Sequence, residues 1–160
     1  MGRDMQAEYK IVPRAMALAG NQQANTKSAA LTMLAEVFAG AYGVDADEVG
    51  ELLAEREALG STGFGGGVAF PHARLPRLDR PVAALVRLEE PIVFGSADAM
   101  PVDLLFGLLS PEGSGAAHLY ALAAMSRLMR TASVPDALRG ARDADGLFAA
   151  LTNVDRQDAA

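Results

Sequence analysis

Cysteine is absent from this sequence of 160 residues, and long hydrophobic runs are absent as well. Without cysteine the chain cannot form a disulfide, a thiolate nucleophile or a Cys-based zinc site. No apolar run reaches the roughly 18 residues that a membrane span needs. The residues at the start, Met1 to Asp4, do not form an apolar signal region. We therefore expect a cytoplasmic protein without membrane insertion.

An excess of positive charge is also missing. The chain has 14 basic and 20 acidic residues, for a net charge of −6. A general nucleic-acid binder would carry a basic balance, so we expect no nucleic-acid partner. Residues 56–90 differ from the rest, because their five basic and four acidic residues give a net charge of +1. This relatively basic segment is either chance or the sign of a local anion site.

Length and composition predict one ordinary domain, since 51% of the residues are hydrophobic and 21% are charged. Apolar residues recur at helical spacing from Lys27 to Tyr42, and Gly43 follows as a stop. A second helix begins at Asp45, where Glu48 completes a capping box. Its apolar stripe, Val49 and Leu52–Leu53, continues at position 56, which holds an arginine. Further helices are expected at 116–130, 133–140 and 145–151.

Short apolar runs between these helices predict strands at 68–70, 82–88 and 102–109, with prolines bounding the first two. The last of them suits a strand that is buried on both faces. In the helix at 116–130, we expect Leu119, Leu122, Ala123 and Met129 to point inward. Helices on both sides of central strands predict the α/β class, a single domain with a mixed sheet flanked by helices. Residues 1–25 are an N-terminal segment of uncertain structure, 26–152 form the domain, and 153–160 form a frayed tail.

A glycine-rich loop occupies Gly60–Gly67. A dinucleotide-binding interpretation is weak, because the loop follows a helix and precedes a strand, the reverse of the Rossmann order. It is not a P-loop either, since no Lys-Ser/Thr pair follows. Glycines here more simply let the chain turn sharply and approach another group closely.

The two histidines are candidates for chemistry. His72 directly follows Pro71 at the end of a short predicted strand, where open α/β sheets place ligands. His118 lies in the first turn of a predicted helix, where the positive end of the helix dipole favours a neutral imidazole and a nearby anion. Taken singly, each could be an unremarkable surface or capping residue. A metal site from both histidines and Asp103 is conceivable, but it lacks a clear third ligand, and we predict no metal and no cofactor.

Arg56 strengthens the case for an anion site. It is predicted on the apolar side of its helix, at the end that leads into the glycine-rich loop, where a charge should be paired or face a ligand. A guanidinium is well shaped to hold two phosphate oxygens. Thr62, Gly63 and His72 follow closely, and Arg74 and Arg77 add positive charge. This combination suits a phosphoryl group held on a histidine.

The stretch from Arg56 to His72 resembles the active-site segment of enzyme IIA of the phosphoenolpyruvate phosphotransferase system, in its fructose/mannitol/nitrogen-regulatory class. The family pattern of R-E-x-x-x-S-T-G, a glycine-rich turn and A-x-P-H is present. The segment Pro101–Phe106 and His118 with Leu119 resemble the family's buried strand and second histidine. The resemblance covers roughly 27–151. Phe64 and Phe70 replace usual aliphatic residues, and Gly66 stands where asparagine is expected.

The resemblance implies that His72 accepts a phosphoryl group from a small histidine-containing phosphocarrier protein. His118 would be the second active-site imidazole and Arg56 the phosphate-holding arginine. From their place close after Arg56, we also expect Thr62 and Gly63 to bind phosphate. We expect the phosphocarrier to dock on a shallow apolar patch formed by Phe64, Phe70 and Leu75 and rimmed by Arg74 and Arg77.

The segments Leu59–Gly63 and Pro111–Gly113 resemble the nitrogen-regulatory branch most. This branch implies a signalling protein whose phosphorylation state controls binding to regulated target proteins. Two alternatives remain, a sugar-transport enzyme IIA that passes phosphate to a separate IIB protein and a binding regulator that transfers no phosphate. Cytoplasmic domains of anion transporters share the broad fold, but they lack the set of Arg56, His72 and His118.

Overall fold

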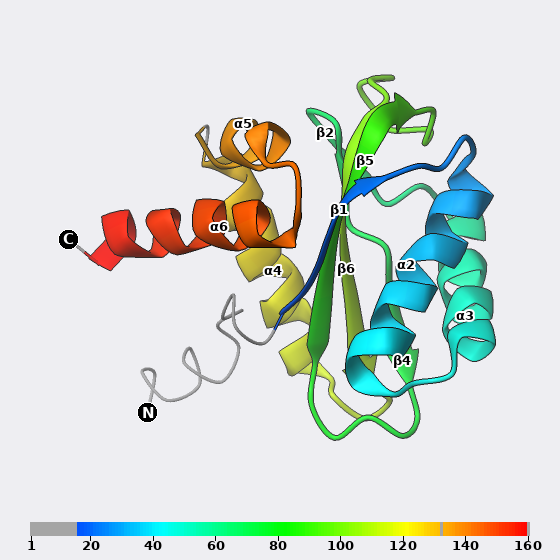
Figure 1. The fold of residues 1–160 in the computed structure, drawn as a ribbon. Coiled ribbons are helices and arrows are strands. Elements are labelled where there is room, and N and C mark those ends of the chain that lie inside the picture. Colours follow the sequence, from blue (N-terminus) through cyan, green and yellow to red (C-terminus); the bar gives the residue numbers. More distant parts are fainter. Residues whose placement is uncertain (1–15, 132, 160) are drawn as a thin grey trace.

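The computed structural model describes residues 16–131 and 133–159 (Figure 1). This part of the chain forms six strands and five helices. Their order is β1 (Met16–Gln22), α2 (Lys27–Tyr42), α3 (Ala46–Ala58), β2 (Gly63–Gly65), β3 (Val68–Ala69), β4 (His72–Leu75), β5 (Val82–Ile92), β6 (Val102–Pro111), α4 (Ala116–Arg130), α5 (Ser133–Gly140) and α6 (Ala144–Ala159). None of these described helices is both long and apolar enough to cross a membrane.

The strands form one mixed sheet in the order β1-β5-β6-β3-β2, and β4 also pairs with β6. β5 and β6 are antiparallel, whereas β1 runs parallel to β5 and both β3 and β4 run parallel to β6. Helices cover both faces of the sheet, α2 and α3 on one side and α4, α5 and α6 on the other (Figure 1). The predicted α/β class, with a mixed sheet flanked by helices, is confirmed.

Each face of the sheet has its own apolar core. One core packs Leu34, Phe38 and Leu53 against the sheet, and the other packs Met125 and Leu138 against its opposite face. β6 contributes to both cores and is buried along almost its whole length, as its apolar run predicts. Helix α2 comes so close to this strand that a Cβ at Gly107 would lie 2.8 Å from Leu34 Cδ2.

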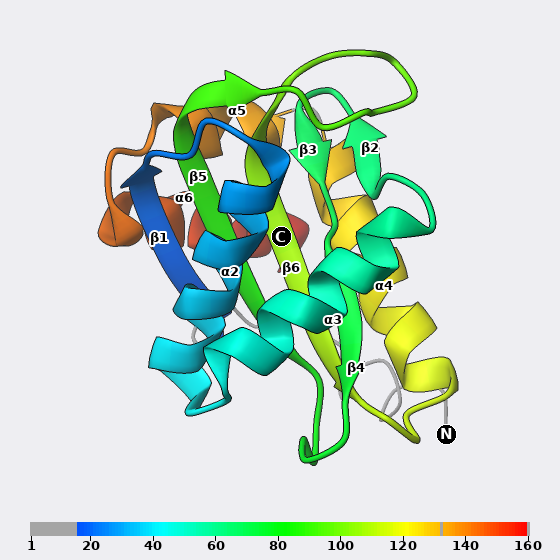
Figure 2. The same cartoon turned by 90° about the vertical axis from the view of Figure 1, so that its right-hand side faces the viewer.

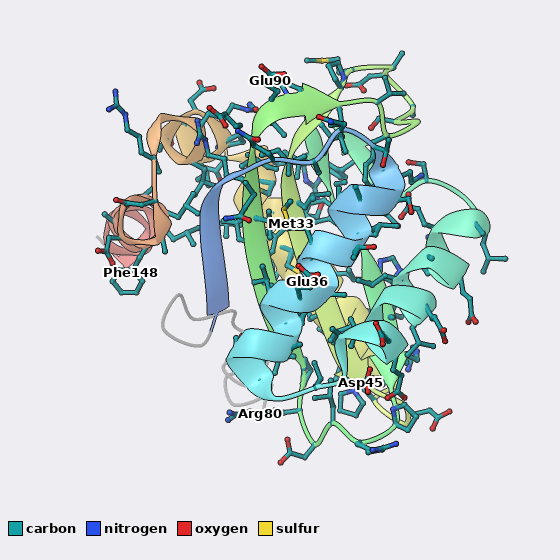
Figure 3. All side chains as sticks on the ribbon, turned by 45° about the vertical axis from the view of Figure 1, so that its right-hand side comes forward. Met33, Glu36, Asp45, Arg80, Glu90 and Phe148 are labelled. Atoms are coloured by element: carbon teal, nitrogen blue, oxygen red, sulfur yellow. The ribbon has the colours of Figure 1, made fainter. Side chains whose placement is uncertain are left out.

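Helix boundaries follow the capping signals in the sequence. Thr26 accepts a hydrogen bond from Ala29 N at the start of α2, and Gly43, with φ of 71°, ends that helix. Asp45 caps α3 through Glu48 N (3.0 Å), at the end of the molecule that also carries Arg80 (Figure 3). The predicted helix at 145–151 is longer than expected, because α6 continues to Ala159 through the residues expected to form a tail.

Three predicted loops or strands differ from the structure. The glycine-rich loop contains a short antiparallel hairpin of β2 and β3, which turns at Gly66 and Gly67 with positive φ values of 64° and 82°. The strand predicted at 82–88 extends through Pro91 to Ile92, since its pairing with β6 is irregular between Arg87 and Ile92 and leaves a place for a residue without an N–H. β1 arises from the unassigned N-terminal segment; residues 1–15 lie outside the described part.

The prediction that Pro71 ends the strand before His72 is wrong in one respect. β3 and β4 keep one register against β6, with Ala69 opposite Leu105 and His72 opposite Leu108. Pro71 interrupts the pairing with β6 because it has no N–H to donate, yet its carbonyl still accepts from Leu108 N (3.0 Å). His72 therefore begins β4 and is held by the sheet rather than by a loop.

The inward face of α4 also differs from the prediction. Leu119 is 66% exposed, and Ala123 is exposed as well. Met129 is buried as predicted, and Leu122 packs partly buried against the core, but the helix also buries His118, Ala121 and Met125. The sequence pattern misplaced Leu119 and Ala123 because an apolar count does not assign a histidine to the core, whereas His118 is buried in the first turn of the helix.

Candidate functional site

His72 lies at the start of β4, between helices α3 and α4, which approach this strand from opposite faces of the sheet (Figure 2). Its Nδ1 is 2.8 Å from the Phe70 carbonyl oxygen. A carbonyl can only accept, so Nδ1 carries the proton and donates it. The other nitrogen, Nε2, therefore keeps its lone pair and is the nucleophilic atom of a half-buried ring.

Arg56 reaches this nitrogen from the last turn of α3. Its Nε donates to His72 Nε2 at 3.1 Å, and its Nη1 donates to the Gly60 carbonyl at 2.9 Å. The sequence predicts a guanidinium near the glycine-rich loop, and the structure adds its direct bond to His72. The fixed positive charge thus lies at the reactive atom.

His118 is the second imidazole beside this atom. The two histidine rings lie 5.3 Å apart, centroid to centroid, and are inclined by 57°. His118 is only 5% exposed, and its Nδ1 lies 2.7 Å from Ser110 Oγ on β6. The sequence analysis did not single out Ser110, because a serine at the end of an apolar strand has no pattern that distinguishes it from a turn residue.

Burial favours the neutral form of both histidines. It is the main cause that lowers the pKa of His118 to about 4, and His72 and Arg74 act in the same direction. The pKa of His72 is also lowered, mainly by burial; Arg56 adds to this, while the bond to the Phe70 carbonyl opposes it. At neutral pH the site therefore holds two uncharged imidazoles beside a permanent cation.

These lowered pKa values predict that acid destabilises the fold before most carboxylates titrate. A histidine whose folded pKa lies below its usual 6.5 stabilises the protein above that pH, and the benefit is lost as the pH falls toward about 4 for His118. Urea unfolding should show a falling free energy of unfolding between pH 6.5 and about 5. The double variant His72→Gln, His118→Gln should flatten this slope, and an unchanged slope would contradict the assignment.

Thr62 and Gly63, the predicted phosphate-binding residues, donate to other groups of the protein. Glu57 accepts from Thr62 N (2.7 Å) and from Thr62 Oγ1 (2.6 Å), while Gly63 N donates to Ser61 Oγ (3.0 Å). The structure therefore does not offer these donors to a phosphate. These hydrogen bonds instead hold the segment between α3 and β2, which comes shortly after Arg56 in the chain.

Glu57 is a structural residue that the sequence analysis did not assign. Its side chain is 4% exposed and pairs with Lys27 Nζ (2.7 Å), which also donates to the Phe94 carbonyl (3.1 Å). The Glu57 carboxylate, in the last turn of α3, thus connects the start of α2 with the segment before β2. Its place next to Arg56 in the sequence motif was the available signal.

We expect Glu57→Ala to lower the free energy of unfolding by about 3 kcal/mol, at the low end for a broken buried pair because Lys27 keeps some exposure. The variant would leave a partly buried ammonium without its carboxylate and two Thr62 donors without an acceptor. Urea unfolding checks this, with the exposed Glu55→Ala on the same helix as the matched control. Equal stability of the two variants would show that the pair contributes nothing.

The predicted docking patch is only partly exposed. Phe64 is 44% exposed and packs edge-on against Phe70, with ring centroids 5.1 Å apart. Phe70 and Leu75 are 8% and 3% exposed, so the prediction that they face a partner is wrong; each belongs to one of the two cores. Arg74 and Arg77 are exposed as predicted.

Two apolar side chains that the sequence analysis did not assign to docking are more exposed. Leu59, at the end of α3, is 86% exposed, and Leu119, next to His118, is 66% exposed. Both adjoin residues of the site along the chain.

Asp103, the conceivable third ligand of a metal, is held by Arg139 instead. The Arg139 Nε lies 3.0 and 2.9 Å from the two carboxylate oxygens of Asp103. Among residues 16–131 and 133–159, no group of three potential metal ligands lies together. The metal alternative therefore has no support here.

Residues 14–154 match the family model described as "Phosphoenolpyruvate-dependent sugar phosphotransferase system, EIIA 2". The chain belongs to this enzyme IIA family. Curated relatives include the nitrogen regulatory protein of Bradyrhizobium diazoefficiens, which is 46% identical over 127 residues, 79% of this chain and 83% of the relative. The nitrogen regulatory protein of Pseudomonas aeruginosa is 43% identical over 110 residues, 69% of this chain and 71% of the relative. The predicted family and its nitrogen-regulatory branch are confirmed.

Solved structures of enzyme IIA proteins share the fold. The nitrogen regulatory protein IIA-Ntr from Neisseria meningitidis superposes with a TM-score of 0.79 at 28% identity, over 87% of this chain and 97% of that chain. The mannitol enzyme IIA from Escherichia coli superposes with a TM-score of 0.71 at 20% identity, over 89% and 99%. Proteins of this enzyme IIA family act as components of a phosphotransferase system.

Proposed function

We propose that this enzyme IIA accepts a phosphoryl group on Nε2 of His72 from a histidine-containing phosphocarrier protein. One observation carries the proposal: His72 donates from Nδ1 to a carbonyl, and its lone-pair nitrogen Nε2 faces a guanidinium. The same ring lies beside a second neutral imidazole. A nucleophile, a fixed cation and a hydrogen-bond donor are the groups that phosphoryl transfer between histidines needs.

The phosphoryl transfer needs no separate base, because Nε2 of His72 already carries a lone pair. The lone pair of His72 Nε2 attacks phosphorus, while the bond from phosphorus to the carrier's histidine nitrogen breaks and leaves its electron pair on that nitrogen. Positive charge develops on the His72 ring, and the Nδ1–H bond to the Phe70 carbonyl stabilises it. No proton has to leave His72 during the step.

Arg56 changes partner during this transfer. In the unphosphorylated protein its Nε donates to the lone pair that must attack, so this bond has to break first. The incoming phosphoryl oxygens then replace Nε2 as acceptors and gain a fixed positive charge. The bond to the Gly60 carbonyl keeps the guanidinium close to the site. Arg56 thus protects the resting nucleophile and stabilises the transferred group.

The proposed docking surface consists of Leu59, Phe64 and Leu119 with Arg74 and Arg77 at its rim. These side chains are exposed, whereas the acceptor ring is half-buried beside them. A carrier has to bring its own phosphohistidine to bonding distance of His72 and then leave, which suits a small and transient contact. Phe64 lies on β2 and Leu119 lies on α4, next to His118 in the chain.

The proposed output is regulatory. Similarity to nitrogen regulatory proteins supports a role in which the phosphoryl group, by adding negative charge at His72, changes the affinity for regulated target proteins. A sugar-transport role with transfer to a separate IIB protein is the second candidate. It is favoured by the fructose-specific EIIA component of Haloferax volcanii, which is 36% identical over 114 residues. The regulatory relatives from Bradyrhizobium diazoefficiens and Pseudomonas aeruginosa, at 46% and 43% identity, favour the first.

Incubation with enzyme I, the phosphocarrier and phosphoenolpyruvate tests the proposed acceptor activity. Intact mass should increase by one phosphoryl group, and the modification should be lost in acid and survive base. Omission of the phosphocarrier should prevent the increase. A protein that stays unmodified in the complete mixture would be a binding regulator that carries no phosphate.

A further inference from the structure

His118, the second imidazole of the site, is in hydrogen-bond contact with the hydroxyl of Ser110. His118 is neutral at pH 7, so its ring has one N–H and one lone pair. Only Nδ1 has a hydrogen-bond partner among the described residues, namely Ser110 Oγ at 2.7 Å. A hydroxyl can donate or accept, so this distance alone leaves two arrangements.

Hydrogen-bond satisfaction distinguishes these two arrangements. Ser110 is fully buried, and within the described part of the chain its hydroxyl has no partner besides His118. If Nδ1–H donated to Oγ, the serine proton would be buried without an acceptor, which proteins avoid. If Oγ–H donates to Nδ1, both groups are satisfied by a single bond. The second arrangement places the ring proton of His118 on Nε2.

We infer that Ser110 is a positioning residue that makes His118 an Nε2–H donor toward the phosphoryl group on His72. The inference rests on the proposed function. His72 and His118 then hold opposite tautomers, each set by its own partner: the Phe70 carbonyl keeps a lone pair on Nε2 of His72, and the Ser110 hydroxyl keeps a proton on Nε2 of His118. One ring attacks phosphorus while the other donates to its oxygens. With the opposite tautomer, His118 would point a lone pair at an anionic group.

The unphosphorylated wild-type protein allows a direct test, because the sequence has only two histidines and four ring nitrogens. Nitrogen-15 labelling of histidine, read through two-bond proton–nitrogen correlations at pH 7.5, should show the protonated nitrogen as Nδ1 in one ring and Nε2 in the other. His118→Gln assigns the two rings. A proton on Nδ1 of His118, or on both of its nitrogens, would overturn the inference whether or not the protein accepts phosphate.

A double-mutant cycle tests whether Ser110 acts through His118. Ser110→Ala should slow phosphoryl transfer about tenfold, a fraction of the effect of losing a donor outright. Its His118 signals should show both tautomers, while those of His72 stay unchanged. In the His118→Gln background, Ser110→Ala should change the rate less than about twofold. Ser126→Ala, a serine on α4 outside the site, is the control. Equal slowing in both backgrounds would show that Ser110 does not act through His118.

Discussion

His72→Ala is expected to abolish the gain of a phosphoryl group in the complete phosphotransfer mixture. The reason is geometric, since His72 is the histidine whose lone pair faces Arg56 at the edge of the sheet. The variant should keep its fold, because the ring is only half-buried and the β4 backbone pairs with β6 independently of the side chain. Intact mass measures the modification, and a thermal melt verifies folding.

His118→Ala is the matched control for this variant. It removes the other imidazole of the pair, but it should still reach full modification, only more slowly. A folded His72→Ala protein that still gains a phosphoryl group would place the acceptor elsewhere. Full modification of His72→Ala together with none of His118→Ala would exchange the two roles.

Arg56→Ala is expected to slow transfer to His72 by roughly 100- to 1,000-fold, the usual cost of removing one preorganised donor to a transition-state oxyanion. The phosphoryl oxygens would lose the cation that the structure holds 3.1 Å from the acceptor atom. Removal of the Arg56 charge should also raise the pKa of His72, because that charge lowers it in the wild-type protein. Rapid-quench kinetics with phosphorylated carrier protein measure the rate.

Arg56→Lys separates charge from shape. Lysine keeps the positive charge, but it cannot hold two oxygens and the Gly60 carbonyl at once, so an intermediate rate is expected. Exposed Arg80→Ala, in the turn before β5 (Figure 3), is the control for a general loss of positive charge and should leave the rate within about twofold. An unchanged rate in Arg56→Ala with a lost melting transition would make the arginine structural.

The sequence predicts the parts of the fold that local signals encode. Thr26, Gly43 and Asp45 set the helix boundaries through caps, and the apolar run before Pro111 identifies the strand buried on both faces. The occurrence of Arg56 and His72 in one motif predicted that they belong to one site, because few residues separate them.

Contacts between segments far apart in the chain could not be predicted in the same way. The pair of Glu57 with Lys27 spans two helices, and the bond of His118 to Ser110 joins a helix to a strand. Burial of Phe70 and Leu75 depends on the face of the sheet to which each side chain points. The two-residue interruption at Pro71 breaks the alternation of the strand, so the sequence pattern does not predict that face. The polar residues of the two long-range pairs, Glu57 with Lys27 and His118 with Ser110, follow no apolar periodicity.

The position of the phosphoryl group is the most direct test of this account. Phosphorus–nitrogen coupling in the phosphorylated protein with nitrogen-15-labelled histidine identifies the bonded ring nitrogen. The geometry predicts coupling to Nε2 of His72 and to no other nitrogen, with Nδ1 still protonated against the Phe70 carbonyl. Coupling to Nδ1 of His72, or to either nitrogen of His118, would contradict the account.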